Sequence, residues 1–221
     1  ASRDDFDPAS ARAVELLQQQ SERFEALLND LLEISRLDAG NIKLELDEVH
    51  LMALCSRVID ALAPSIRDLN VSVDIVAGQS LGPVTCDVRR IERVVRNLVA
   101  NAIEHAQGRT VTVCIAETDT DVAIVVRDRG IGLKPGEAAL VFNRFWRADP
   151  SRQRTLGGTG LGLSISFEDA RVHAGWLDAD GEPDGGSAFR LVIPRVFGDE
   201  VEQAPLPLAL GEIDAWIESN R

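Results

Sequence analysis

Basic side chains are scarce in this 221-residue chain. It carries 23 Lys and Arg against 36 Asp and Glu, which gives a formal net charge of −13. A surface that neutralises nucleic-acid phosphates needs an excess of basic residues, so nucleic acid is excluded as a main partner. An anionic ligand would have to be held by a local group of residues.

Cysteines and long apolar runs are scarce as well. The three cysteines, Cys55, Cys86 and Cys114, are far apart and form no CxxC pair. This spacing argues against a disulfide framework or a zinc site and favours reduced thiols in a reducing compartment. No apolar run approaches the roughly 20 residues that cross a bilayer, and the acidic first residues do not resemble a signal peptide.

The remaining composition, 45% hydrophobic, is sufficient for a folded core. The charge is unevenly distributed. Residues 1–48 carry 5 basic and 12 acidic side chains, and residues 196–221 carry 1 and 6, whereas residues 49–195 are nearly neutral. We therefore expect an acidic arm, a body and an acidic tail, with boundaries at 1–40, 41–195 and 196–221.

The arm has a helical pattern. Between Pro8 and Gly40 there is no further Gly or Pro, and Leu17, Phe24 and Leu31 lie seven residues apart. This pattern predicts a helix of about 30 residues, roughly 45 Å long. A helix of that length outruns a small body, which favours a seam in a helical bundle or dimer. The alternative is a helix packed on the body.

The body mixes strand and helix patterns. Alternating apolar residues predict strands at 42–49, 71–76, 84–86, 111–115, 122–126, 176–179 and 188–193. Helical spacing predicts helices at 51–69, with a kink or break at Pro64, from a cap at Asp87 to about Gln107, and up to His173. We expect an α/β sandwich, a mixed β-sheet covered on one face by helices, preceded by the long helix.

In the tail, the spacing of apolar residues predicts one short helix beyond the proline-rich stretch 204–207. Its apolar stripe consists of Leu210, Ile213, Trp216 and Ile217. A helix this short needs a docking surface, so we expect it to dock on the body of its own or a neighbouring chain, with Trp216 as the anchor. Its negative charge would favour a cationic segment around Arg144 and Arg147. The alternative is a disordered tail.

Two asparagines lie on one face of the helix that follows Asp87. Asn97 and Asn101 are four residues apart, so their carboxamides point the same way. An amide oxygen is a ligand that Mg²⁺ accepts together with phosphate oxygens and water. A solvated polar face explains the pair equally well.

Two glycine-containing segments follow. Asp128, Gly130 and Gly132 come directly after a strand, where a carboxylate can accept a hydrogen bond from an amino group beside a closely approaching backbone. An ordinary turn is the alternative. The run 157–163, GGTGLGL, opens a helix, and its backbone N–H groups can surround phosphates, although it is neither a Rossmann fingerprint nor a P-loop.

Between these segments, residues 127–154 carry 7 basic and 3 acidic side chains, with aromatics interleaved from Phe142 to Arg147. A cationic, glycine-flanked segment is what a lid over a polyphosphate requires. In this order, the motifs resemble those of the ATP-binding domain of bacterial sensor histidine kinases. Residues 97–101 resemble the N box, 128–132 the G1 box, 142–145 the F box and 158–162 the G2 box.

The resemblance covers residues 15–194 and is similar in detail, around residues 158–170, to the MtrB-type branch of that family. The sequence LLEISRLDAG resembles the second helix of the family's dimerisation bundle. The resemblance implies ATP and Mg²⁺ as cofactors. It also implies that the partners are a dimerisation helix of the same or a partner subunit and a response regulator, in a homodimeric, membrane-anchored sensor whose catalytic part is cytoplasmic.

The resemblance also implies roles for individual residues. Asn101 would bind Mg²⁺, Asn97 would support the nucleotide, and Asp128 would accept the adenine amino hydrogen. The backbone that meets the phosphates would be that of Gly158, Thr159, Gly160, Leu161 and Gly162, with Gly130 and Gly132 shaping the adenine side. Arg144 and Arg147 are candidate phosphate contacts. Glu104 stands where the family usually has Lys, which puts one phosphate contact in doubt, while His105 can stack near adenine or lie at the surface.

The chain lacks the family's phosphoacceptor. Its three histidines are His50, His105 and His173, and none lies in a motif such as His-Glu-Leu-Arg-Thr-Pro. We therefore assign no catalytic side chain and expect the chain to begin after the acceptor helix, as a fragment of a longer receptor. His173, near a helix end, is expected to be structural.

Other readings of the same motifs stay open. Gyrase-like and MutL ATPases activate water with a Glu four residues before the metal-binding Asn, a position held here by Asn97. An interaction module without nucleotide binding would be expected to lose the Asn or the glycines. A serine kinase of the anti-sigma type would lack the long arm.

Overall fold

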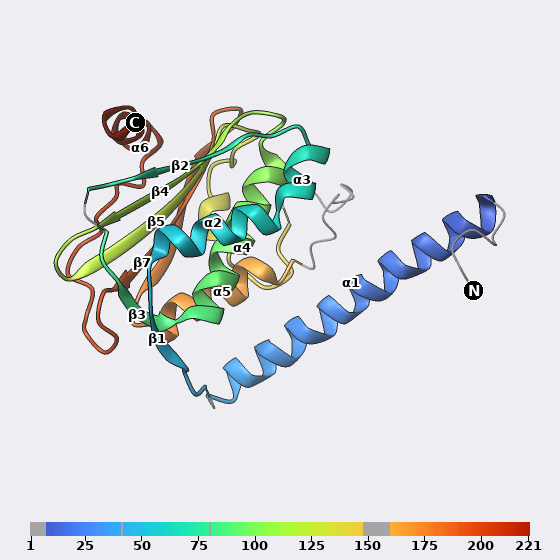
Figure 1. Cartoon of the computed structure of the whole chain (residues 1–221), viewed down its shortest axis with the longest axis horizontal. Coiled ribbons are helices and arrows are strands. Elements are labelled where there is room, and N and C mark those ends of the chain that lie inside the picture. The colour runs from blue at the N-terminus through green and yellow to red at the C-terminus, as the bar shows by residue number, and fades with distance from the viewer. Residues whose placement is uncertain (1–7, 41, 80, 148–159) are drawn as a thin grey trace.

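The computed structural model describes residues 8–40, 42–79, 81–147 and 160–221. Figure 1 shows a layered body of sheet and helices from which one long helix projects. A five-stranded sheet has the order β2-β4-β5-β7-β6, with the parallel pair β2–β4 and antiparallel pairs elsewhere. Its strands are β2 (Val73–Ala77), β4 (Val111–Glu117), β5 (Asp121–Asp128), β6 (Trp176–Glu182) and β7 (Gly186–Pro194). The prediction of a mixed sheet is confirmed.

Helices cover one face of this sheet: α2 (Leu51–Ala61), α4 (Val88–His105) and α5 (Gly162–Val172), with the short α3 (Ala63–Asp68) and the 3₁₀ turn η2 (Glu137–Ala139) beside them. Alternation along β5 explains the layering. Val122, Ile124 and Val126 join the core under the helices, whereas Ala123 and Val125 face the opposite side. The two faces therefore have separate apolar clusters.

The helix expected over 51–69 is divided at Leu62, in line with the kink or break predicted at Pro64, because Pro64 occupies the first turn of a new helix, α3. One strand differs from the sequence prediction. The strand expected from Ile42 begins only at Leu46, since its partner β3 (Val84–Asp87) is four residues long. Asp87 caps α4 as predicted, accepting a hydrogen bond from the backbone N–H of Arg90 at 3.2 Å.

The long helix α1 (Pro8–Asp38) has 31 residues, close to the length predicted. Its apolar stripe is uncovered: Leu17 is 70% exposed, Phe24 61% and Leu31 47%. Near the C-terminal end of α1, Ile34 is buried with Leu161 and Ile165 of the body. An exposed apolar stripe of this kind is typical of a surface that binds another helix. The seam in a bundle or dimer stays a prediction. None of the helices in the described ranges has an apolar stretch long enough to cross a membrane.

The tail helix α6 (Leu210–Asn220) packs on the sheet face that the other helices leave open (Figure 1). Leu206, Ile213 and Ile217 are almost fully buried there, and Trp216 is partly buried beside them. The expected charge partner of this helix is wrong: Asp214 pairs with Arg127 and Arg129, in β5 and just after it. The tail therefore covers the back of the sheet.

Candidate functional site

The two asparagines of α4 have different surroundings. The side-chain amide of Asn97 donates to the carbonyl of Gly162 and to the hydroxyl of Ser166, both at 3.0 Å. It thus links α4 to the first turn of α5. Asn101, one turn further along, makes no side-chain hydrogen bond within the described part of the chain. Its amide oxygen is therefore available to a ligand.

Asp128 lies at the end of β5 and is only 1% exposed. Its carboxylate accepts a hydrogen bond from the backbone N–H of Gly130 at 2.8 Å and another from the hydroxyl of Ser187. Burial raises the pKa of Asp128 above its ordinary value, although these hydrogen bonds and the charge of Arg127 act in the opposite direction. A desolvated and oriented acceptor of this kind suits a ligand that donates an N–H group.

The glycines after Asp128 bring the backbone against its neighbours. A Cβ on Gly130 would lie 1.8 Å from the carbonyl oxygen of His105, at the end of α4. Gly132 has φ +69°, and a Cβ there would lie 1.8 Å from the carbonyl oxygen of Glu182. Ile131 N–H also donates to His105 at 3.3 Å. The loop lies between α4 and the β6–β7 turn, and a side chain at position 130 or 132 would not fit there.

The aromatic segment divides into a core side and a surface side. Phe142 stacks on Phe167 with ring centroids 5.5 Å apart and meets Phe189 edge-on at 6.1 Å. Phe145 is 61% exposed with φ +61°, and its N–H donates to the carbonyl of Gly160 at 3.1 Å. The sequence motif alone does not distinguish these two roles.

The structure places the predicted site residues around the C-terminal half of α4. Asn97 contacts Gly162, His105 contacts the loop of Gly130, and Phe145 contacts Gly160. Arg144 is exposed and Arg147 half-buried beside them, while Leu161 is buried at the base of α1. Gly158 and Thr159 lie outside the described residues. Contacts that involve the backbone thus join the segment 160–162 to both Asn97 and Phe145, and join the loop after Asp128 to the end of α4.

Sequence reasoning missed Ser187 as a partner of Asp128. The two residues are opposite each other in the β5–β7 register, 59 positions apart in the chain. No local pattern marks Ser187, because its role depends on strand pairing.

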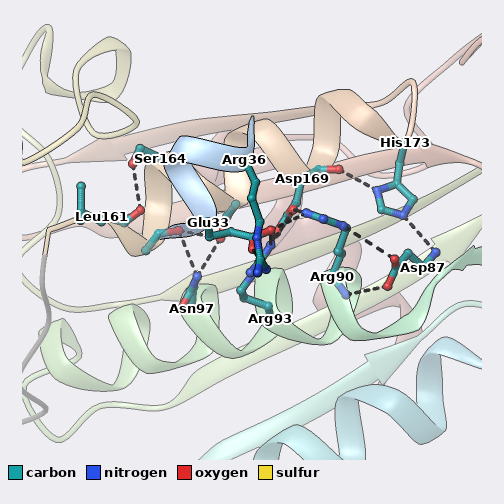
Figure 2. A network of polar contacts seen from close by, with 12 residues as sticks. Glu33, Arg36, Asp87, Arg90, Arg93, Asn97, Leu161, Ser164, Asp169 and His173 are labelled. Atoms are coloured by element: carbon teal, nitrogen blue, oxygen red, sulfur yellow. Dashed lines mark hydrogen bonds and ion pairs between the residues drawn. The ribbon is translucent and has the colours of Figure 1, made fainter. Parts of the chain in front are cut away.

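A network of charges ties α4, α5 and α1 together (Figure 2). Arg90 and Arg93 of α4 both bond the carboxylate of Asp169 at 2.8 Å, and both reach Glu33 of α1, at 2.8 and 3.1 Å. Burial outweighs the two arginines at Asp169 and raises its pKa. Burial also tends to raise the pKa of Glu33, but there Arg93 and Arg90 outweigh it and the pKa is lowered. The difference arises because the Glu33 side chain is 13% exposed, whereas that of Asp169 is 0% exposed.

His173 completes this network at the end of α5. Its Nε2 accepts from the backbone N–H of Asp87 at 3.0 Å, and Nδ1 lies 2.6 Å from the carbonyl oxygen of Asp169. Burial lowers the pKa of His173, although Asp169 and Asp87 act in the opposite direction. The neutral ring with Nδ1 protonated fits both contacts, which gives His173 the structural role expected of it.

The three cysteines are unpaired and buried, and burial raises the pKa of each thiol to about 12. Within the described ranges, no group of three or more His, Cys, Asp or Glu side chains is arranged to hold a metal ion. A metal at this site would therefore depend on the amide oxygen of Asn101 together with ligands from a bound molecule.

Comparison with known proteins identifies the architecture. Residues 86–196 match the model of the histidine kinase-, DNA gyrase B- and HSP90-like ATPases. The chain belongs to this ATPase family. The matched range contains α4, the loop after Asp128 and α5, so the family's nucleotide-binding fold is the part of the chain that carries the predicted motifs.

Within the family, the similar relatives are sensor histidine kinases. MtrB of Mycolicibacterium paratuberculosis is 50% identical over 206 residues, which cover 92% of this chain and 36% of that protein. AfsQ2 of Streptomyces coelicolor is 37% identical over 190 residues, covering 86% of this chain and 34% of its own length. The resemblance to MtrB-type kinases is confirmed, and the chain spans about a third of the length of these relatives.

Solved structures agree on the fold. Full-length ShkA in complex with AMPPNP superposes with a TM-score of 0.75 at 24% identity, covering 86% of this chain and 40% of that one. The catalytic domain of the histidine kinase ThkA gives a TM-score of 0.60 at 26% identity, covering 69% of this chain and 99% of that domain. The longer overlap with ShkA extends the likeness beyond the catalytic domain.

Proposed function

We propose that the chain is the ATP- and Mg²⁺-dependent catalytic domain of a protein-histidine kinase. It would transfer the γ-phosphoryl group of ATP to a histidine on a dimerisation helix that this chain does not contain. The observation that carries the proposal is that α4 contacts both the loop after Asp128 and the segment 160–162, which in turn contacts Phe145. The protein's share of phosphoryl transfer is mainly positioning and charge neutralisation, which such an arrangement provides.

The roles of the side chains follow from their surroundings. The buried carboxylate of Asp128 would accept the adenine amino hydrogen, beside Gly130 and Gly132. Backbone N–H groups of the glycine run 158–162 would face the phosphates, since α5 begins at Gly162 and a helix N-terminus favours anions. Arg144 and Arg147 would meet the same phosphates from the aromatic segment, and His105 would border the adenine.

Asn101 fits a magnesium ligand because its amide oxygen has no partner within the described part of the chain. Mg²⁺ is commonly held by few protein ligands together with substrate phosphates and water, and when bound it neutralises phosphate charge. Asn97 supports the site through α5, since it donates hydrogen bonds that the catalytic Glu of a hydrolase could not donate. This favours a kinase over a water-activating ATPase.

The proposed partners are those expected of a sensor histidine kinase. The exposed stripe of α1 would pair with a dimerisation helix of its own or a partner subunit, and a response regulator would accept the phosphoryl group. The complete protein would be a homodimeric sensor in the inner membrane, with this part in the cytoplasm.

Replacing Asn101 by Ala or Asp tests the proposed metal ligand. The affinity for a non-hydrolysable ATP analogue in the presence of Mg²⁺ should fall about tenfold or more, equivalent to ~1.4 kcal/mol, because Ala removes one ligand and Asp adds a negative charge beside the phosphates. Titration calorimetry measures it. Asn220→Ala, the same change at an exposed site, should leave the affinity unchanged. Unchanged affinity in both Asn101 variants would refute the metal assignment.

A further inference from the structure

The tail helix α6 makes a charged contact directly behind Asp128. Arg127, the preceding residue of β5, points to the opposite face of the sheet and is 3% exposed. Its guanidinium donates to both oxygens of Asp214 in α6, through Nε at 3.2 Å and Nη2 at 3.0 Å. A buried guanidinium needs a counter-charge, and here the tail supplies it.

The same guanidinium also holds the backbone around the nucleotide loop. Arg127 donates to the carbonyl of Asp128 and, at 3.1 Å, to the carbonyl of Gly185 in the β6–β7 turn. Asp128 is the last residue of β5, and Gly185 directly precedes β7, the strand that carries Ser187. One side chain therefore fixes both strand ends from behind.

The β6–β7 turn in turn fits against the glycine loop. Asp184 N–H donates to the carbonyl of Ile131 at 2.9 Å, and Gly132 lies against the carbonyl of Glu182. A Cβ on Gly186 would lie 2.1 Å from the carbonyl oxygen of Asp128, so the turn and the strand end have little room to shift independently. A displacement of Arg127 would therefore shift the glycine loop that follows Asp128.

We propose that Asp214 is a positioning residue for the nucleotide site. Through Arg127 it fixes the strand end from which Asp128 projects, so docking of α6 raises the affinity for adenine nucleotides. Arg129, 36% exposed, adds a second ion pair to the same carboxylate at 3.0 Å. This inference rests on the proposed function, because the consequence concerns the nucleotide that Asp128 would bind.

The coupling must be reciprocal. If a docked α6 strengthens nucleotide binding, bound nucleotide must strengthen the docking of α6 by the same factor. This consequence separates positioning from simple structural support, since a helix that only covers the sheet would be insensitive to an occupied site on the other face.

The first experiment compares Asp214→Asn with Glu212→Gln, an equal loss of charge at an exposed position of the same helix. In the full 221-residue chain, the dissociation constant for ADP should rise about tenfold in Asp214→Asn and stay within about twofold in Glu212→Gln. Asp214→Glu, which keeps the charge, should recover most of the affinity. A folded Asp214→Asn that binds ADP as tightly as the unmodified chain would overturn the proposal.

The second experiment uses the unmodified chain and is independent of how the variants fold. Hydrogen exchange is measured with and without saturating ADP, taking the amides of α2 as the reference for any global effect. Amides of α6 should slow by a larger factor than those of α2; equal factors would overturn the proposal. If the unmodified chain binds no ADP, the proposed function itself fails, whereas binding without either effect removes only the role of Asp214.

Discussion

Asp169→Ala should lower the free energy of unfolding by about 3–5 kcal/mol, because it removes the fully buried carboxylate that two half-buried arginines share. Asp169 is fully buried and bonds Arg90 and Arg93. Glu33 of α1 becomes the remaining carboxylate that both arginines bond among the described residues. The loss should therefore weaken the packing of α5 on α4 and the attachment of α1 together.

Urea unfolding followed by circular dichroism measures this change. Glu168→Gln is the matched control, since its exposed partner Arg171 lies 3.4 Å away at the surface, and a change there should stay within about 0.5 kcal/mol. If both variants unfold at the same urea concentration, the buried network does not stabilise the domain as described.

Gly130→Ala should abolish nucleotide binding and destabilise the domain by about 3 kcal/mol or more. The new Cβ would lie 1.8 Å from the carbonyl oxygen of His105 and 2.8 Å from the Cα of Ala106. Both neighbours are backbone atoms of the end of α4, so no side-chain rotation can relieve the clash. The loop that follows Asp128 would have to leave its place.

The control for this substitution is Gly211→Ala. A Cβ at Gly211 meets no atom within 4 Å, and alanine is favoured over glycine in a helix by about 1 kcal/mol. Calorimetry with ADP and thermal unfolding distinguish the two variants. A Gly130→Ala protein that binds ADP normally would show that the loop is not packed as the structure has it.

Local patterns in the sequence predicted much of the fold. The uninterrupted apolar heptads before Gly40 predicted α1, and the side chain of Asp87 predicted the start of α4, because both depend on neighbours in the chain. The strand predicted from Ile42 was too long, because its length depends on its partner β3, and the alternation of apolar residues does not reveal that partner.

The site was predicted in its residue types but not in its connections. Asn97 and Asn101 look equivalent in the sequence, yet the amide hydrogens of Asn97 are used to hold α5. Arg127 is the basic residue of β5, and a buried guanidinium requires a counter-charge. Its partner Asp214 lies 87 residues away, and the tail offers several other acidic residues, so only the tertiary structure selects it.

Phosphoryl transfer tests the central claim most directly. The chain is incubated with γ-labelled ATP and Mg²⁺, alone and with a separately supplied histidine-containing helical bundle of a related kinase. The account predicts no acid-labile label on this chain alone, because it lacks the acceptor motif, and acid-labile label on the supplied bundle that forms more slowly with Asn101→Ala. Label on this chain alone, or an unlabelled bundle in the presence of a chain that binds ATP, would contradict the account.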